Sequence, residues 1–185
     1  MVQPGPRPGR GDLTLTETPF LHLIDRDGWY FVRRPGIAGT VMMVALTDQN
    51  DLLFVQQQRP PLGHACIELP AGLAGDKAEY AGEPLAAAAR RELLEETGYH
   101  AEAVTHLCDA ATSPGITDET VSFFLCTGLT KRHAGGGVER EKITVHEVPL
   151  DTAFDWLLAQ QAQGHAVASK AFAGVLFALR ADAAR

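Results

Sequence analysis

The chain has no surplus of basic residues. Its 16 Lys and Arg are outnumbered by 23 Asp and Glu, which gives a formal net charge of −7. Proteins that bind nucleic acid or anionic membranes usually carry basic patches that attract phosphate groups. We therefore expect neither kind of partner. A negatively charged ligand would need local Arg or Lys side chains, or a bound metal ion, to offset the overall repulsion.

Cysteine and long apolar runs are also scarce. Cys66, Cys108 and Cys126 form an odd, widely spaced set without zinc-ligand spacing, so we expect small buried residues in a reducing compartment. No apolar run reaches the length of a membrane span. Residues 1–11, rich in Pro, Gly and Arg, lack the apolar core of a signal peptide. These absences favour a soluble, cytoplasmic protein.

What the sequence does contain suits one compact domain. Hydrophobic residues make up 45% of the 185 positions, which is enough for a substantial core. Residues 1–13 are rich in Pro and Gly and are predicted to be a disordered tail. Residues 14–185 are predicted to form a single domain without internal repeats.

The pattern of apolar residues indicates an α/β fold. Two short runs joined by Asp27-Gly28 predict an N-terminal antiparallel strand pair over residues 20–24 and 29–33. The run 39–47 is almost entirely apolar, as expected of a strand that is buried on both faces. Strands mixed with one helix and followed by two helices indicate an α/β/α sandwich built on a mixed β-sheet. The further strands are predicted at 52–57, 101–108, 121–127 and 143–148.

Three helices are predicted from their end signals. The first covers residues 83–97, since Pro84 suits the first helical position and Gly98 the position just past the end. Asp151 is expected to cap a second helix that ends near residue 163, and Ser169 a third with an apolar stripe. The two closing helices are expected to pack on one face of the sheet.

The end of the first helix carries an unusual amount of negative charge. Glu92, Glu95 and Glu96 share one side of it, near the C-terminus, where the helix dipole disfavours anions. Arg91 can offset Glu95 at its own i+4 position. From the carboxylates alone, a solvated acidic face is the commoner explanation. A hard divalent cation held by carboxylate oxygens would also relieve the repulsion.

The same segment resembles the signature of the Nudix hydrolases. Residues 91–99 read Arg-Glu-Leu-Leu-Glu-Glu-Thr-Gly-Tyr, and Glu83 precedes Arg91 by eight positions. The family's glycine, six residues before the first Glu, would fall at position 77, which is Lys here. Gly72, in Leu-Pro-Ala-Gly, resembles the displaced glycine, with five extra residues in the loop before Glu83.

The resemblance extends over about residues 20–179 and implies the Nudix-type α/β/α sandwich. It also implies hydrolysis of a nucleoside diphosphate linked to another moiety, with Mg²⁺ or Mn²⁺ as cofactor. Features on three other segments resemble the members that cleave ADP-ribose and related nucleotide sugars. These are the segments 56–61 with 68–72, 113–119 and 138–146. We therefore expect hydrolysis of a nucleoside diphosphate sugar, ADP-ribose being the leading candidate.

Metal ligands are expected first from the acidic helix. Glu92 and Glu96, four residues apart, are the primary candidates, and Glu96 is expected to be exposed when no metal is bound. Glu95 is a further ligand or a partner of Arg91, which is expected to orient carboxylates. The resemblance implies one further metal ligand, the main-chain carbonyl of Ala71 in the Leu-Pro-Ala-Gly segment.

The general base is expected from outside the signature. The resemblance implies Glu139 as the base and Glu141 as an additional metal ligand, whereas a Gly-rich loop with such charges is equally often only solvated. Glu83 matches the first acidic residue of the motif, but its place before a proline makes helix capping at least as good an explanation.

Substrate contacts are assigned to several loops and strands. Arg59 suits bidentate recognition of phosphate or sugar oxygens, and Glu68 suits sugar hydroxyls. Ser113 and Glu119 lie in a loop that resembles a pocket-lining loop of the nucleotide-sugar subgroup. Trp29 is a candidate for stacking on a nucleobase, although aromatics at strand spacing are more often core or interface residues.

Two kinds of alternative remain open. The substrate could be another diphosphate, such as GDP-mannose, a dinucleotide or coenzyme A. The chain could instead be a non-catalytic, nucleotide-binding regulator, which would be expected to have lost a metal carboxylate. Because related sugar-nucleotide hydrolases are often dimers with interlocked N-terminal strands, the resemblance also implies a homodimer.

Overall fold

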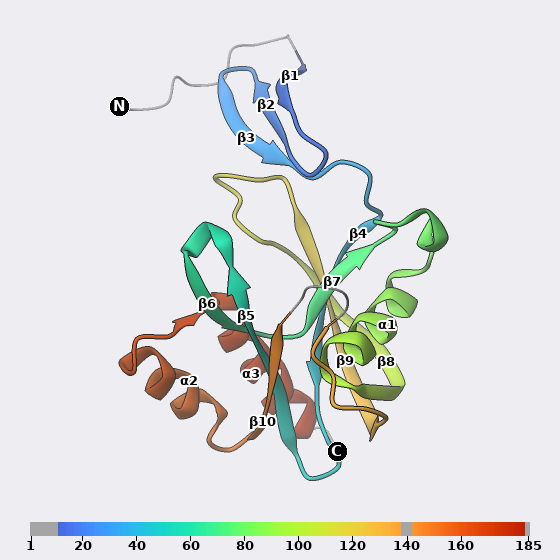
Figure 1. Cartoon of the computed structure of the whole chain (residues 1–185), viewed down its shortest axis with the longest axis vertical. Coiled ribbons are helices and arrows are strands. Elements are labelled where there is room, and N and C mark those ends of the chain that lie inside the picture. The colour runs from blue at the N-terminus through green and yellow to red at the C-terminus, as the bar shows by residue number, and fades with distance from the viewer. Residues whose placement is uncertain (1–10, 138–141, 184–185) are drawn as a thin grey trace.

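The computed structural model describes residues 11–137 and 142–183. Its N-terminal part is a separate antiparallel sheet of three strands that projects from the body (Figure 1). The expected hairpin is present, with positive φ angles at Asp27 and Gly28 in its turn. An additional strand pairs with it and includes Asp12 and Leu13, which we had expected in the tail. The strands are β1 (Asp12–Glu17), β2 (His22–Arg26) and β3 (Trp29–Arg33).

The body contains two four-stranded mixed sheets. The first has the order β7-β4-β9-β8, in which β4 and β9 are parallel. Its strands are β4 (Gly39–Ala45), β7 (Ala71–Ala74), β8 (Tyr99–Ala111) and β9 (Thr120–Lys131). The second has the order β10-β5-β6-β11, in which β6 and β11 are parallel. Its strands are β5 (Asp51–Arg59), β6 (His64–Glu68), β10 (Ile143–Pro149) and β11 (Ala166–Val167). Strands β6, β7 and β11 were not anticipated from the sequence.

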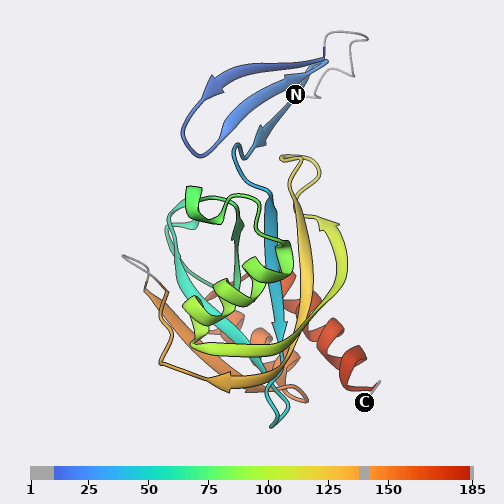
Figure 2. The same cartoon turned by 90° about the vertical axis from the view of Figure 1, so that its right-hand side faces the viewer.

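Strand β4 lies at the centre because both of its faces are apolar. Met42 and Val44 pack in a core cluster with side chains of the two C-terminal helices, α2 (Ala153–Ala162) and α3 (Ser169–Asp182). Val41 and Met43 point the other way, toward α1 (Leu85–Thr97). This alternation follows from the two-residue period of a strand. Helices therefore cover opposite faces, and the predicted α/β/α architecture is confirmed (Figure 2).

The helix ends differ slightly from the predicted ones. Pro84 is the N-cap of α1 and not its first helical residue, whereas Gly98 ends the helix as expected, with φ 78° and an N–H bond to the carbonyl of Leu94. Thr152, not Asp151, precedes α2. Ser169 is the first residue of α3, and Ala168 is its cap. Two short 3₁₀ turns, η1 (Pro60–Leu62) and η2 (Ala78–Tyr80), interrupt the loops around β6 and β7.

The cysteines are all free. Cys66 and Cys126 are buried as expected, whereas Cys108 is half-buried. Within the described residues, no helix combines the length and the apolar character needed to cross a membrane.

Candidate functional site

A cavity of about 840 Å³ opens beside α1, between this helix, β7 and the end of β5. It collects most of the residues that the sequence singled out for chemistry. Cavities of this size are typical of small-molecule sites. The predicted residues that line it are Arg59, Glu68, Ala71, Arg91, Glu92, Glu95, Glu96 and Glu119.

Glu96 is held against the strand that precedes the acidic helix. Its Oε2 accepts a hydrogen bond from the main-chain N–H of Ala71, at 3.0 Å. The residue is 5% exposed, so the expectation of an exposed carboxylate is wrong. The reason is that α1 packs on β7, which brings the end of Leu-Pro-Ala-Gly directly over the last turns of the helix. Ala71 and the carboxylate of Glu96 therefore belong to one wall of the cavity.

The surroundings of Gly72 explain why this position is occupied by a glycine. A Cβ atom at this position would overlap the carboxyl group of Glu92, so only glycine leaves room for that side chain. The geometry agrees with the interpretation of Gly72 as the displaced glycine of the motif. Burial disfavours the charged form and raises the pKa of Glu92 to about 7, although Arg91 beside it opposes the shift. A cation next to Glu92 would stabilise its ionised form.

Arg91 organises the carboxylates around it. Its guanidinium pairs with Glu83 at 2.7 Å and with Glu92 at 2.9 Å, while Glu95 lies farther away at 3.6 Å. The predicted pairing with Glu95 is therefore the weakest of three. Glu83 makes no capping hydrogen bond to the helix. Its position in the motif is explained by its contact with Arg91, which in turn fixes Glu92.

The segment between Gly72 and Glu83, which holds the five extra residues, contributes to the same arrangement. It contains η2, whose Tyr80 ring lies 4.0 Å from the guanidinium carbon of Arg91. Such a cation–π contact further restrains the guanidinium of Arg91. Arg91 also donates to the carbonyl of Leu73, at 3.2 Å. Asp76 and Lys77, from the same loop, line the cavity.

The donor set of this wall fits a hard divalent cation. Glu92, Glu95 and Glu96 offer carboxylate oxygens, and Ala71 offers a main-chain carbonyl. Oxygen ligands of this type suit Mg²⁺ or Mn²⁺ better than softer metals. Among the described residues, no three Asp, Glu, His or Cys side chains converge closely enough to hold a metal by themselves. The carbonyl oxygen of Ala71 is one further group that could complete such a ligand set.

Arg59 and Glu68 face each other across the β5–β6 pair. Two hydrogen bonds of 2.6 and 2.7 Å join the Nε and Nη2 atoms of Arg59 to the two carboxylate oxygens of Glu68. This bidentate pair orients the guanidinium at the edge of the cavity. Both residues line the cavity, and Glu68 already serves as the partner of Arg59.

Glu119 is likewise engaged with protein groups. It pairs with Arg34 at 3.4 Å and accepts a hydrogen bond from the Thr40 hydroxyl at 3.1 Å. Its loop also contacts the N-terminal sheet, because Arg33 pairs with Asp118 at 2.7 Å. The three-stranded sheet is therefore attached to the rim of the cavity by ion pairs.

Two of the predicted residues that the structure describes, Trp29 and Ser113, do not line this cavity. Trp29 lies on the projecting sheet and is 46% exposed, and Ser113 is exposed at a turn of the β8–β9 loop. Glu139 and Glu141 lie outside the described residues. The flanks of their segment do border the site, since the N–H of Gly137 donates to the carbonyl of Glu95, at 3.1 Å, and Lys142 lines the cavity.

The sequence analysis missed some lining residues. Arg34 follows a strand and Lys170 follows the start of a helix, and neither stands in a motif. Asp76 and Lys77 stand in the segment that holds the five extra residues, where no spacing rule applies. Only the tertiary arrangement brings these side chains to the acidic helix.

Comparison with known proteins agrees with the motif. The family model described as the NUDIX domain matches residues 37–172. A methanol dehydrogenase activator of Bacillus methanolicus is 37% identical over 68% of this chain and 64% of its own length. An ADP-ribose pyrophosphatase of Mycobacterium tuberculosis is 37% identical over 75% of this chain. The match spans 63% of that relative, so just under two thirds of its length is represented.

A solved structure shares the fold. The crystal structure of an ADP compounds hydrolase superposes with a TM-score of 0.64 over 80% of both chains, at 21% sequence identity. At this identity the likeness concerns the fold alone. The family model, however, covers most of the chain, including the acidic helix and Gly72. The chain therefore belongs to the Nudix family.

Proposed function

We propose that the protein is a metal-dependent hydrolase of nucleoside diphosphate sugars, with ADP-ribose as the leading substrate. One observation carries the proposal: the Nudix carboxylates and the Arg59–Glu68 pair line the same cavity. The names of similar proteins support it, since relatives at 35–40% identity include ADP-ribose and ADP-sugar pyrophosphatases. All three Glu residues at the end of α1 are retained, which disfavours a non-catalytic regulator.

The reaction needs a positioned water and neutralisation of the diphosphate. The water oxygen forms a bond to one phosphorus, and the bond between that phosphorus and the bridging oxygen breaks. The products are a nucleoside monophosphate and a sugar phosphate. Mg²⁺ or Mn²⁺, when bound, would neutralise the phosphate oxygens and orient the water. Glu92, Glu96 and the Ala71 carbonyl would hold the ion, while Arg91 orients Glu92.

The proposed base is Glu139, with Glu141 as an additional metal ligand. The neighbouring Gly136 and Gly137 bond to the last carbonyls of α1, so the segment starts beside the proposed metal site. Glu139→Gln is expected to lower turnover by about 10²–10⁴-fold, the usual contribution of a general base. The melting shift caused by Mg²⁺ should stay unchanged, as calorimetric scans can show. An unaffected rate would transfer the role to Glu95 or Glu141.

We further propose a homodimer that forms through the N-terminal sheet. Leu15 on β1 and Phe20 in the connection between β1 and β2 are 44% and 74% exposed, and a cluster of such side chains is typical of an interface. Trp29 lies outside the cavity of its own chain, so its proposed contact with the nucleobase would be made across the dimer. Further exposed apolar residues of the sheet are Leu13, Leu21, Leu23 and Tyr30.

Leu15→Asp combined with Phe20→Asp is expected to convert the dimer to a monomer, because the charges would be buried without partners. Light scattering after size-exclusion chromatography would measure the mass. Leu176→Asp, which changes an exposed leucine on α3, is the control and should remain dimeric. A wild-type protein that is monomeric at micromolar concentration would contradict the dimer.

A substrate panel tests the function itself. We expect Mg²⁺-dependent release of AMP and ribose 5-phosphate from ADP-ribose, detected by chromatography. GDP-mannose, a dinucleotide, coenzyme A and a nucleoside triphosphate complete the panel. Faster cleavage of another diphosphate would correct the substrate. Absence of cleavage across the panel, with both Mg²⁺ and Mn²⁺, would refute the proposed function.

A further inference from the structure

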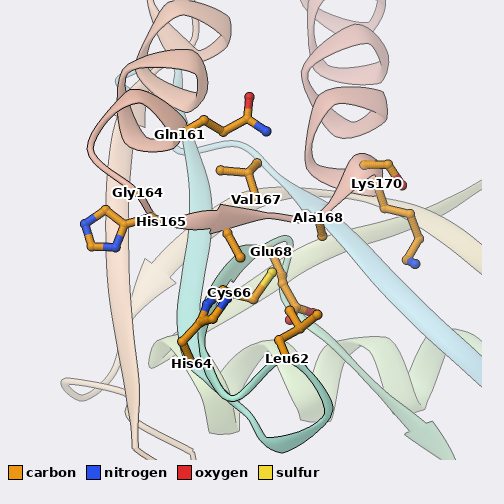
Figure 3. Close-up of a pocket in the computed structure, with 12 residues that line it drawn as sticks. Leu62, His64, Cys66, Glu68, Gln161, Gly164, His165, Val167, Ala168 and Lys170 are labelled. Atoms are coloured by element: carbon orange, nitrogen blue, oxygen red, sulfur yellow. The ribbon is translucent and has the colours of Figure 1, made fainter.

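A second cavity adjoins the first one. Its volume is about 710 Å³, and it lies between β6, β11, the end of α2 and the start of α3 (Figure 3). Glu68 and Lys170 line both cavities, so the two are connected along these side chains. In Figure 3 both residues lie on the same side of the second cavity, with Gln161 of α2 at another edge. This volume also falls within the range of small-molecule sites.

The charges at the junction point to Lys170. Each arginine that lines the first cavity is already paired with a carboxylate: Arg34 with Glu119, Arg59 with Glu68 and Arg91 with Glu83. Lys170 is different, because no carboxylate among residues 11–137 and 142–183 forms an ion pair with it. Its ammonium group is therefore available to an anionic group of a ligand.

The second cavity suits a sugar better than a nucleobase. No Phe, Tyr or Trp side chain is among the residues that line it, so it offers no indole, phenol or phenyl ring on which a base could stack. It does offer hydrogen-bonding groups from His64, Gln161 and Ser169. Such groups match the hydroxyls of a sugar, each of which can donate and accept.

We propose that the sugar phosphate half of the substrate extends from the first cavity into the second, and that Lys170 binds an oxygen of its phosphate at the junction. The sugar would then occupy the space between β6 and the start of α3. This assignment rests on the proposed hydrolysis of a nucleoside diphosphate sugar. If so, Lys170 is a specificity-determining residue for the sugar phosphate half of the substrate, which carries no nucleobase.

Lys170→Met tests the assignment, since methionine keeps much of the length of the side chain without its charge. A charge-assisted hydrogen bond contributes enough that KM for ADP-ribose should rise about 10–100-fold. With Mg²⁺ present, calorimetry should show a similar loss of affinity for ribose 5-phosphate and unchanged affinity for AMP. Lys170→Arg should retain most of the binding. The matched control is Lys131→Met, because Lys131 pairs with Glu147 and lines neither cavity.

A second variant probes the cavity itself. Gln161 is exposed near the end of α2, so Gln161→Trp can narrow the second cavity and preserve the fold. Gln161→Trp should weaken the binding of ribose 5-phosphate severalfold and leave the affinity for AMP unchanged. If the wild type cleaves ADP-ribose but Lys170→Met binds both products normally, the inference is overturned and the proposed function stands. The inference would also be overturned if Lys170→Met bound AMP more weakly but ribose 5-phosphate normally. Wild-type inactivity on every diphosphate would overturn both.

Discussion

Glu96→Gln is expected to abolish metal-dependent turnover. Glutamine can keep the hydrogen bond to the Ala71 N–H through its amide oxygen, but it lacks the charge that a divalent cation needs. Losing several kcal/mol of charge stabilisation corresponds to a fall in turnover of about 100-fold or more. Steady-state rates over a range of Mg²⁺ concentrations would measure this fall in turnover.

Thermal melting provides an independent test of the effect of Glu96→Gln on metal binding. A metal ion at about 100 times its Kd stabilises a folded protein by about 2.7 kcal/mol, or roughly 5–10 °C for a chain of this size. The wild type should show this shift with Mg²⁺ or Mn²⁺, and Glu96→Gln should lose most of it. Glu102→Gln, on an exposed part of β8, is the matched control. Retained activity within severalfold would remove Glu96 from the metal site.

The fold was predictable where a local pattern determines the structure. The apolar run of β4, the Asp27-Gly28 turn and the glycine after α1 each specify one local conformation, and all three are present. Strand β7 was missed because it is only four residues long and begins inside the Leu-Pro-Ala-Gly stretch, which reads as a loop. It becomes a strand only through pairing with β4, which is a tertiary interaction.

The site was predictable in its residues more than in their roles. Helical spacing correctly placed Glu92 and Glu96 on one wall, because their separation is set by the helix alone. Spacing could not reveal that Glu96 is buried against Ala71 or that Glu68 is already paired with Arg59. Such pairings join segments that are distant in sequence. Lys170, at the far end of the chain, stands in no motif and was missed for the same reason.

Gly72→Ala is expected to damage the site and spare the fold. The added methyl group would overlap the carboxyl end of Glu92, a flexible side chain that can move away at little cost to folding. Once displaced, this carboxylate no longer points to the proposed metal position. Changes that disorient a ligand typically cost about 10–100-fold in metal affinity or activity. We expect turnover at limiting Mg²⁺ to fall by that factor, with partial recovery at high Mg²⁺.

A double-mutant cycle distinguishes this cause from general destabilisation. If Gly72→Ala acts only by displacing Glu92, it should add little to the effect of Glu92→Gln, since the carboxylate is already lost. Effects that multiply would instead mean that Gly72 is needed for another reason, such as the pairing of β7 with β4. Melting scans without metal provide the control for folding: Gly72→Ala should melt close to the wild type, because the side chain it displaces is flexible. If the two effects do not add, a glycine is required at position 72 because any larger residue would displace the carboxylate of Glu92. The contact with Glu92 would then explain why the glycine of the motif stands at this position.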